Sequence, residues 1–296
     1  MPGNAVGAAG AAALAGVGAR GAKALAAATW PSFKALNLEG CSICAAGAEP
    51  LAAASWASCL QHLDLCESYV GDRGAAALAA LAALRSLNLT ANGITAAGVW
   101  ACMRLPNLTD LDLSENNIED DGAVALAAAA WPGQEKLGLC ACLLSSEGAA
   151  FLAAASSSWP SLRLLDLTMN PLCDAGVLML RAGSWPSLER LILSEIEVTG
   201  TGAAALASTA LPCLEYLHFS GCPLGDAGAA ALTAGAWPAL QQLYLDSVDL
   251  SSAGVAALVA APNWPALKLL SVAGSAGDER AAAAAAAAAR GLDLVL

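Results

Sequence analysis

One short pattern of leucines recurs along most of this chain and constrains its fold more than any other feature. The segment Leu-x-x-Leu-x-Leu occurs in ten repeats that are 24 to 28 residues apart. A fixed period of this kind indicates an architecture in which each repeat stacks only on its neighbours. Nine repeats begin at Phe33, Leu60, Leu84, Leu108, Leu162, Leu188, Leu214, Leu240 and Leu267, and a weaker one surrounds Leu137 and Leu139.

Each repeat continues with the same succession of residue types. Three positions after the last leucine stands a Cys, an Asn or a small residue, as at Cys41, Asn92 and Cys222, and an apolar residue follows two positions later. A glycine then comes at a constant offset. The alanine-rich run after it predicts a helix, because alanine is the best helix former. The glycines are Gly47, Gly74, Gly98, Gly122, Gly148, Gly176, Gly202, Gly228 and Gly254.

Polar side chains two residues before these glycines are expected to cap the helix of their own repeat. An Asp or Ser oxygen at a helix start can accept hydrogen bonds from the first N–H groups of the helix. Strand, capped turn and helix would then form the repeating element. The polar residues concerned are Asp72, Asp120, Ser146, Asp174, Asp226 and Ser252.

Most of the predicted helices end at a Trp-Pro pair, because proline cannot continue a helix. Two interpretations of the tryptophans are open: a buried ladder along the helix-to-strand edge of the core, or an exposed aromatic strip for a ligand. Large aromatic side chains are usually buried, which favours the ladder. The tryptophans are Trp30, Trp131, Trp159, Trp185, Trp237 and Trp264.

These repeats resemble the leucine-rich-repeat family, whose strand segment has the pattern Leu-x-x-Leu-x-Leu-x-x-Asn/Cys-x-Leu. The resemblance covers residues 30–275. The full helix with its Gly-Ala-x-Ala-Leu motif is similar to the ribonuclease-inhibitor-like class, and within it to the alanine-rich GALA subtype. The resemblance implies an α/β fold, a leucine-rich-repeat solenoid or horseshoe with a parallel β-sheet on the concave side and α-helices on the convex side.

No shift in composition divides the chain, so we expect one continuous domain over residues 1–296. Residues 1–29 hold a degenerate repeat, with Val17 in the apolar position and Gly21 in the glycine position, and are expected to form an N-terminal cap. Residues 276–296 are expected to form a terminal alanine-rich helix and one last strand.

The charge balance restricts the kind of partner. Thirteen basic and twenty-five acidic residues give a net charge of -12, which repels nucleic acid and anionic lipid. We therefore expect a protein partner that is basic or neutral, with no nucleic acid and no membrane. Much of the 57% hydrophobic content is alanine, which is too weakly apolar to hold a helix in lipid. Ten dispersed cysteines fit a reducing, cytoplasmic compartment, and we expect a monomer.

An acidic recognition surface is predicted on the concave face. Side chains alternate along a strand, so the residues between and beside the leucines point to that face. Such a surface would attract a basic partner over a distance, and the alternative is an ordinary solvated face. The acids there are Glu39, Asp64, Glu67, Asp110, Asp112, Glu115, Asp166, Glu195 and Asp246, against the bases Lys136 and Arg190.

A second candidate site lies nearer the C-terminus. Arg190, Tyr216 and Gln242 follow one another in one concave column, and Ile192, His218 and Tyr244 follow in the next. Tyr and Arg are enriched among interface residues that carry binding energy, so we expect a hot spot for the protein partner here. The alternative is that these side chains only cover the surface.

Little in the sequence indicates catalysis, a metal or a cofactor. Cys41 and Cys44 have metal-ligand spacing, but Cys41 falls in the expected buried column, and no second pair follows. The only histidines, His62 and His218, are too far apart along the repeats to share a site. We therefore predict a non-enzymatic, protein-binding scaffold with no cofactor.

Three other functions are open. One is inhibition of a basic enzyme, as the resemblance to ribonuclease inhibitor suggests. Another is that the chain is the sensor fragment of a larger receptor or ubiquitin-ligase adaptor. The third is GTPase activation of the Ran type, because proteins of that kind resemble this class and use an arginine in an early strand-to-helix loop. Arg73 matches that arginine in position only.

Overall fold

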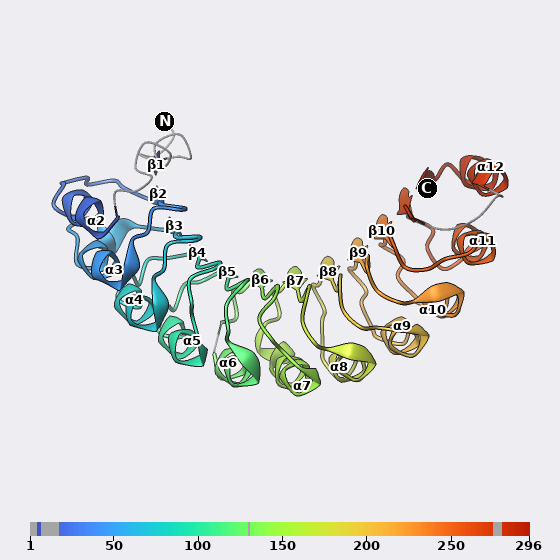
Figure 1. Cartoon of the computed structure of the whole chain (residues 1–296), viewed down its shortest axis with the longest axis horizontal. Coiled ribbons are helices and arrows are strands. Elements are labelled where there is room, and N and C mark those ends of the chain that lie inside the picture. Colours follow the sequence, from blue (N-terminus) through green and yellow to red (C-terminus); the bar gives the residue numbers. More distant parts are fainter. Residues whose placement is uncertain (1–4, 7–17, 130, 275–279) are drawn as a thin grey trace. The chain divides into compact units, whose positions relative to one another are not determined.

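The computed structural model describes residues 5–6, 18–129, 131–274 and 280–296. The chain forms two compact units, residues 1–143 and residues 144–296, which we call unit 1 and unit 2. In unit 1 the elements are β1 Ala5–Val6, α2 Gly18–Ala26, β2 Ala35–Asn37, α3 Cys44–Ala52, the 3-10 helix η1 Ala57–Cys59, β3 His62–Asp64, α4 Gly71–Leu78, β4 Ser86–Asn88, α5 Ala96–Cys102, β5 Asp110–Asp112, α6 Glu119–Ala127 and β6 Lys136–Gly138 (Figure 1).

Unit 2 repeats the same alternation of helix and strand. Its elements are α7 Ser146–Ala155, the 3-10 helix η2 Ser156–Ser158, β7 Leu164–Asp166, α8 Cys173–Leu180, β8 Arg190–Ile192, α9 Gly200–Ala207, β9 Tyr216–His218, α10 Gly225–Leu232, β10 Gln242–Tyr244, α11 Ser252–Ala260, β11 Leu269–Ser271, α12 Arg280–Arg290 and β12 Asp293–Val295.

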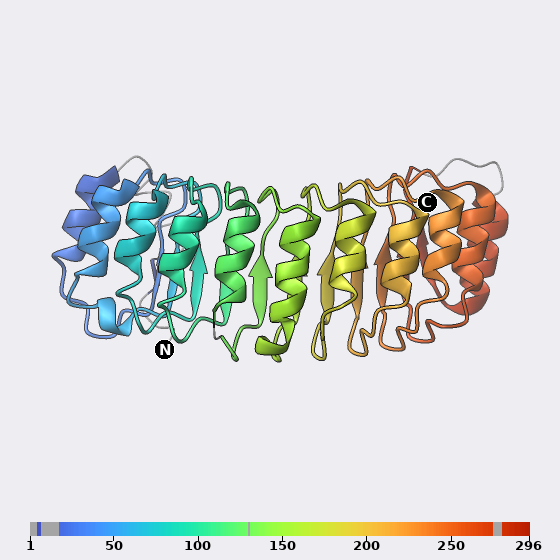
Figure 2. The same cartoon turned by 90° about the horizontal axis from the view of Figure 1, so that it is seen from below.

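Within each unit the strands pair in parallel and in chain order. In unit 1, β2 to β6 align the middle leucines of successive repeats, from Leu36 to Leu137. In unit 2, β7 to β12 do the same from Leu165 to Leu294. The helices of each unit lie side by side over one face of its strands (Figure 2). The predicted α/β leucine-rich-repeat architecture is therefore confirmed in both units. We call the sheet face turned away from the helices the strand face.

The core between strands and helices contains the predicted leucines and tryptophans. The leucines of the repeated segment are almost fully buried. Five of the six tryptophans that precede a proline are buried as well, namely Trp131, Trp159, Trp185, Trp237 and Trp264, which confirms the ladder. Trp30 is half-buried.

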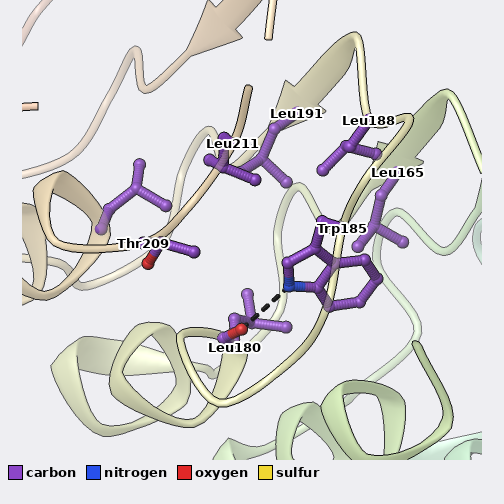
Figure 3. A pocket seen from close by; sticks show the side chains of 8 residues that line it. Leu165, Leu180, Trp185, Leu188, Leu191, Thr209 and Leu211 are labelled. Carbon is purple, nitrogen blue, oxygen red and sulfur yellow. Dashed lines mark hydrogen bonds between the residues drawn. The ribbon is translucent and has the colours of Figure 1, made fainter. Parts of the chain in front are cut away.

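One repeat of unit 2 carries a smaller residue where its neighbours carry tryptophan. Leu211 occupies that position, and a small apolar cavity lies beside it, bounded by Leu188, Leu191 and Trp185 (Figure 3). The indole N–H of Trp185 donates to the carbonyl of Leu180 at 3.0 Å. The indole N–H of Trp185 therefore has a hydrogen-bond partner. The cavity is the volume that Leu211 leaves unfilled at a position where neighbouring repeats carry tryptophan.

The Cys and Asn column binds backbone groups inside the core, which explains the choice of residue. The side-chain oxygen of Asn116 accepts hydrogen bonds from the N–H groups of Asn92 and Ile94 in the preceding repeat. Its amide nitrogen donates to the carbonyls of Leu89 and Leu113. Buried backbone groups need such partners, so each asparagine joins two consecutive repeats.

The polar residues before the repeat glycines act differently from the sequence-based prediction. Asp72 lies in α4, but its carboxylate accepts hydrogen bonds from the N–H and hydroxyl of Thr95 and from the N–H of Gly98, all in the next repeat. Asp174 binds Thr199 and Gly202 in the same way. The prediction that these acids cap their own helices is therefore wrong.

The helix caps themselves alternate along the chain. Thr95, Ser145, Thr199 and Ser251 are N-caps whose hydroxyls accept from an N–H two residues on. The predicted caps Ser146 and Ser252 lie one residue too late. In the intervening repeats α4, α8 and α10 have no side-chain cap, and their first-turn Asp bonds forward to the next helix. Two repeats, one of each kind, therefore form a hydrogen-bonded pair.

This forward bond also accounts for the glycine of the capped repeats. A Cβ at Gly202 would lie 2.6 Å from a carboxylate oxygen of Asp174, and one at Gly98 would lie 2.5 Å from Asp72. In the intervening repeats the obstacle is the repeat's own apolar residue, as at Gly74, where a Cβ would lie 2.4 Å from Val70. Both kinds of repeat need glycine because the helix starts are packed against neighbouring atoms.

Asp226→Ala tests the forward bond. Asp226 accepts hydrogen bonds from the hydroxyl and N–H of Ser251, and these, led by the hydroxyl, lower its pKa below the usual 3.8. A lowered carboxyl pKa contributes stability above about pH 3.8 that is lost as the pH falls through the folded-state value. We expect a loss of roughly 0.5 to 1 kcal/mol at pH 7, because the group is exposed, and a smaller loss at pH 3.

Urea unfolding at both pH values measures this difference. Glu147→Ala is the matched control, since Glu147 is also an exposed first-turn acid of unit 2. An equal loss in both variants would show that the bond to Ser251 adds nothing beyond the helix dipole.

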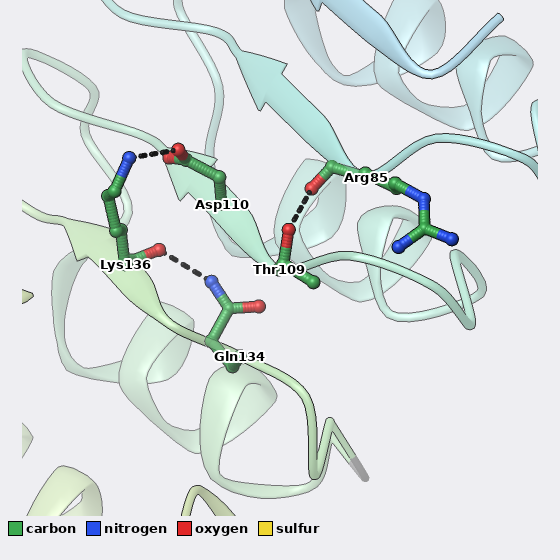
Figure 4. Close-up of polar contacts among 5 residues, drawn as sticks. All are labelled: Arg85, Thr109, Asp110, Gln134 and Lys136. Carbon is green, nitrogen blue, oxygen red and sulfur yellow. Dashed lines mark hydrogen bonds and ion pairs between the residues drawn. The ribbon is translucent and has the colours of Figure 1, made fainter. Parts of the chain in front are cut away.

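The repeat around Leu137 and Leu139, whose leucine pattern is the least regular, has a polar residue in its core. Gln134 stands where neighbouring repeats have the first leucine and is fully buried. Its amide nitrogen donates to the carbonyl of Lys136 at 2.6 Å, but its side-chain oxygen has no partner (Figure 4). A buried acceptor without a partner costs free energy, so this repeat is less stable than its neighbours.

Replacing Gln134 by Leu should therefore raise the free energy of unfolding by roughly 1 kcal/mol or more. Denaturant titration measures the change, and Leu108→Gln, the reverse change at the equivalent position of the preceding repeat, should lower stability. A loss of stability in Gln134→Leu would mean that the amide's bond to Lys136 outweighs the unpaired oxygen.

The structure shows elements in both of the predicted terminal segments. β1 pairs with β2, and α2 carries a buried Gly21. α12 precedes β12, which pairs with β11. Val17 and residues 276–279 lie outside the described residues. The division into a cap over 1–29, repeats over 30–275 and an end segment over 276–296, and the single continuous domain, stay predictions.

Candidate functional site

The strand face of each unit is lined by two rows of side chains, one from each side of the middle leucines. In unit 1 the first row is Ala35, His62, Ser86, Asp110 and Lys136, and the second is Asn37, Asp64, Asn88, Asp112 and Gly138. In unit 2 the first row is Leu164, Arg190, Tyr216, Gln242 and Leu269, and the second is Asp166, Ile192, His218, Tyr244 and Ser271.

The second row of unit 1 combines a turn function with charge. The carboxylates of Asp64 and Asp112 accept the N–H of the residue two positions later, at 3.0 and 2.9 Å. Asn37 and Asn88 make the same bond with a neutral amide. Where these four residues stabilise the turn after the strand, a side-chain oxygen is enough and no charge is needed. The negative charge of the two aspartates is available for another role.

Five predicted acids of unit 1 lie near one another, around Asp64 and Cys66. We call Glu39, Asp64, Glu67, Asp112 and Glu115 the acidic cluster. Burial raises the pKa of Asp64, the N–H of Cys66 opposes this, and the nearby charges of Glu39 and Asp112 raise the pKa further. The repulsion among these carboxylates means that a cation placed between them would be stabilised.

Asp110, the remaining predicted acid of unit 1, is already neutralised. Its carboxylate lies 2.9 Å from the ammonium of Lys136 on the neighbouring strand (Figure 4). Beside it, the hydroxyl of Thr109 donates to the carbonyl of Arg85 at 3.1 Å. The densest predicted group, Asp110 with Asp112 and Glu115, is therefore less negative than its sequence suggests, and the field comes mainly from the acidic cluster.

Cys66 lies among the residues of the acidic cluster, and its pKa shows the effect of their negative charge. Its pKa is raised to about 11 by burial and by the charges of Asp64, Glu67, Glu39 and Glu115, in that order. Since the thiolate is the reactive form, on the order of 1% of this thiol is reactive at pH 9. The thiol is thus protected by its surroundings, and its reactivity measures them.

Neutralising a neighbour should make Cys66 more reactive. We expect Glu67→Gln to lower the Cys66 pKa and to raise its rate of alkylation by iodoacetamide at pH 9 by about twofold, because one repelling charge is removed. Peptide mapping after timed alkylation follows this thiol alone. Glu147→Gln makes the same charge change on a helix of unit 2 and should leave the rate unchanged; equal rates in all three proteins would contradict the cluster.

The second predicted site forms a contiguous group in unit 2. We call Arg190, Tyr216, His218, Gln242 and Tyr244 the aromatic cluster. The guanidinium carbon of Arg190 lies 4.4 Å from the ring centroid of Tyr216. The rings of Tyr216 and Tyr244 are 5.2 Å apart, and that of His218 is 5.3 Å from Tyr244. The Tyr244 hydroxyl donates weakly to Gln242 at 3.5 Å.

Packing of these rings changes their proton affinities. Burial raises the pKa of Tyr216, with Tyr244 and Asp166 adding to it and Arg190 opposing. Burial also lowers the pKa of His218, although Asp246 and Asp166 pull it upward. Both groups are therefore neutral near pH 7, and the cluster is an apolar surface bearing one cation. Asp166 and Asp246, two of the three predicted acids of unit 2, lie at its side.

Three apolar side chains next to the cluster were not among the predicted site residues. Leu164, Ile192 and Leu269 occupy the two rows of unit 2 and are only half-buried. The sequence held a sign of them, since Leu164 and Leu269 each precede another strand leucine. Two consecutive residues of a strand point to opposite faces, so one leucine of each pair has to face solvent.

The remaining candidates have structural explanations. Cys41 is buried while Cys44 is exposed, and no group of three or more His, Cys, Asp or Glu side chains among the described residues is arranged to hold a metal ion. Arg73 lies in the first turn of α4 and not in a loop, with its guanidinium 2.7 Å from Glu49 on α3. No described helix is long and apolar enough to span a membrane.

Comparison with known proteins supports the repeat assignment. A family model described as Leucine Rich repeat matches residues 82–101, 104–127 and 210–232. The chain has the same fold as an internalin (inlF) from Listeria monocytogenes strain 4b F2365, at TM-score 0.54 and 18% identity over 89% of this chain and 80% of that one. It is similar to a chain in the structure of the Rad7 and Elc1 complex in yeast, at TM-score 0.50 and 20% identity over 96% and 86%.

The repeated strands and helices, the Asn and Cys column and these matches give both units a leucine-rich-repeat fold. No curated protein matches its sequence.

Proposed function

We propose that this protein is a non-catalytic scaffold that binds a protein partner on its strand faces, and that the acidic cluster accepts a basic segment of that partner. The observation that carries the proposal is the cluster itself. Its carboxylates act on one another and on the thiol of Cys66, and Lys136, the lysine in the two rows of unit 1, is already paired with Asp110. A basic segment would relieve their repulsion and be steered toward them by the net charge of -12.

The test uses a fluorescein-labelled octalysine peptide as a basic probe. The double variant Asp64→Asn/Asp112→Asn keeps both turns, because Asn37 and Asn88 make the same bonds naturally. We expect fluorescence anisotropy to show affinity about tenfold weaker than that of the wild type at low salt, and a smaller dependence on salt, because two charges of the contact are lost.

The matched control is Asp121→Asn/Glu147→Gln, which makes the same change in net charge at exposed helix positions. It should lower affinity only slightly. If both double variants weaken binding equally, the probe senses net charge alone, and the acidic cluster is not a binding site.

The finer expectations about the repeat class and partner belong to the same proposal. Full helices of seven to ten residues in α3 to α11, rich in alanine, support the ribonuclease-inhibitor-like class with GALA-type repeats. An inhibitor of a basic enzyme would be one form of the proposed binding. We also propose a monomer in the cytoplasm, as the dispersed cysteines favour, none of which forms a disulfide in the described part of the chain.

A further inference from the structure

The strand face of unit 2 differs in chemistry from that of unit 1. Around the aromatic cluster the two rows hold Leu164, Ile192 and Leu269, all half-buried, together with one carboxylate, Asp166. Apolar and aromatic side chains that share a surface with a few polar groups at its edge are typical of the centre of a protein interface. We therefore expect this face to bind a different chemical group from the one that binds to unit 1.

Arg190 is the basic residue in the two rows of this face. It is exposed, and no carboxylate in the described part of unit 2 lies within ion-pairing distance of it; the neighbouring Arg163, by contrast, is paired with Glu189 at 3.1 Å. The ring of Tyr216 lies 4.4 Å from its guanidinium carbon and fixes the orientation of that plane. A guanidinium whose face rests on a ring still has N–H groups at its edge, which suit the two oxygens of a carboxylate.

Two residues next to Arg190 on this face are apolar, and Asp166 lies beyond them, opposite Ile192. Leu164 pairs with it on β7, and Ile192 follows two positions later on β8 and points to the same face. A ligand that places a carboxylate on Arg190 therefore places its adjoining atoms on leucine, isoleucine and tyrosine. A polypeptide C-terminus with an apolar last residue has this combination, since its carboxylate and side chain leave the same carbon atom.

The alternative of a cation held between the rings is disfavoured by geometry. The three rings of Tyr216, His218 and Tyr244 lie 5.2 to 6.1 Å apart, so they contact one another and leave no room for an ammonium group among them. Arg190 already covers the ring of Tyr216. Asp246 at the edge is bonded to the Ser271 hydroxyl and the N–H of Ala273.

We propose that the strand face of unit 2 binds the free C-terminal carboxylate of a partner polypeptide whose last residue is apolar, with Arg190 on the carboxylate and the apolar side chain against Leu164, Ile192 and Tyr216. The inference deepens the proposed protein-binding function, since it names what the second unit recognises. It does not depend on the acidic cluster of unit 1.

The three tyrosines of the chain allow the site to be observed directly. With 3-fluorotyrosine incorporated, fluorine NMR gives separate signals for Tyr216 and Tyr244 in the cluster and for Tyr69, which is 70% exposed in unit 1 and serves as the internal control. The probes are acetyl-Gly-Ser-Leu with a free carboxylate, the same peptide as its C-terminal amide, acetyl-Leu-Glu-Gly-amide with an internal carboxylate, and acetyl-lysine amide.

We expect only the free-acid peptide to shift the signals of Tyr216 and Tyr244 saturably, with Tyr69 unmoved. Arg190→Gln should weaken this binding by about tenfold or more, because a charge-assisted pair is lost, and Arg190→Lys should weaken it less. Arg163→Gln is the matched control and should bind as the wild type does. Circular dichroism and thermal unfolding show whether each variant is folded.

Several outcomes would overturn the proposal. If the C-terminal amide binds equally well, the site does not recognise the carboxylate. If the peptide with the internal carboxylate binds equally well, the site does not require a C-terminus. Binding of acetyl-lysine amide at the rings would make the site one for cations. If the octalysine peptide still binds unit 1 while all four probes fail here, this inference fails and the proposed function stands; the reverse result would reject the basic segment and keep the C-terminal site.

Discussion

The backbone groups that each repeat cannot satisfy by itself are hydrogen-bonded by the next repeat, and the rest of the structure depends on this. Each strand from β2 to β12 is three residues long, which is too short to be stable alone, and gains its partners only from its neighbours. Asn92, Asn116 and Asn170 bury an amide to complete the turns. Asp72 and Asp174 reach forward to the start of the next helix. A repeat therefore cannot be removed or mispaired without exposing unsatisfied groups.

That constraint leaves one surface free to vary. The core side of each strand has to be leucine, and the helix start has to be glycine, because carboxylate or methyl groups occupy the space a side chain would need. The outward positions on the strands touch nothing of the core. In unit 1 they carry amides and carboxylates, and in unit 2 they carry rings and aliphatic groups. Similar repeats can thus present opposite chemistries, since packing does not select those residues.

The two surfaces also differ in how firmly the fold holds their side chains. Asp64 and Asp112 are fixed by bonds to their own turns, and Glu67 and Glu115 stand on strained turn positions. The aromatic cluster is fixed by contact between rings and by the guanidinium of Arg190. In each case the side chains are ordered before a partner arrives, which reduces the entropy lost on binding.

The sequence by itself determined the repeat, the positions of all ten central strands and the core, because hydrophobic periodicity follows directly from side-chain direction. It also predicted candidate site residues on or beside the strands of both units. Only the tertiary structure decided which charges are free. Asp110 and Lys136 are 26 residues apart, and Arg73 and Glu49 are 24 apart, so their pairing depends on how neighbouring repeats stack. The same is true of the caps: a local pattern could not show that Asp174 bonds to Thr199, 25 residues ahead, in place of its own helix. A sequence motif describes one repeat, so it cannot predict hydrogen bonds and ion pairs that join one repeat to the next.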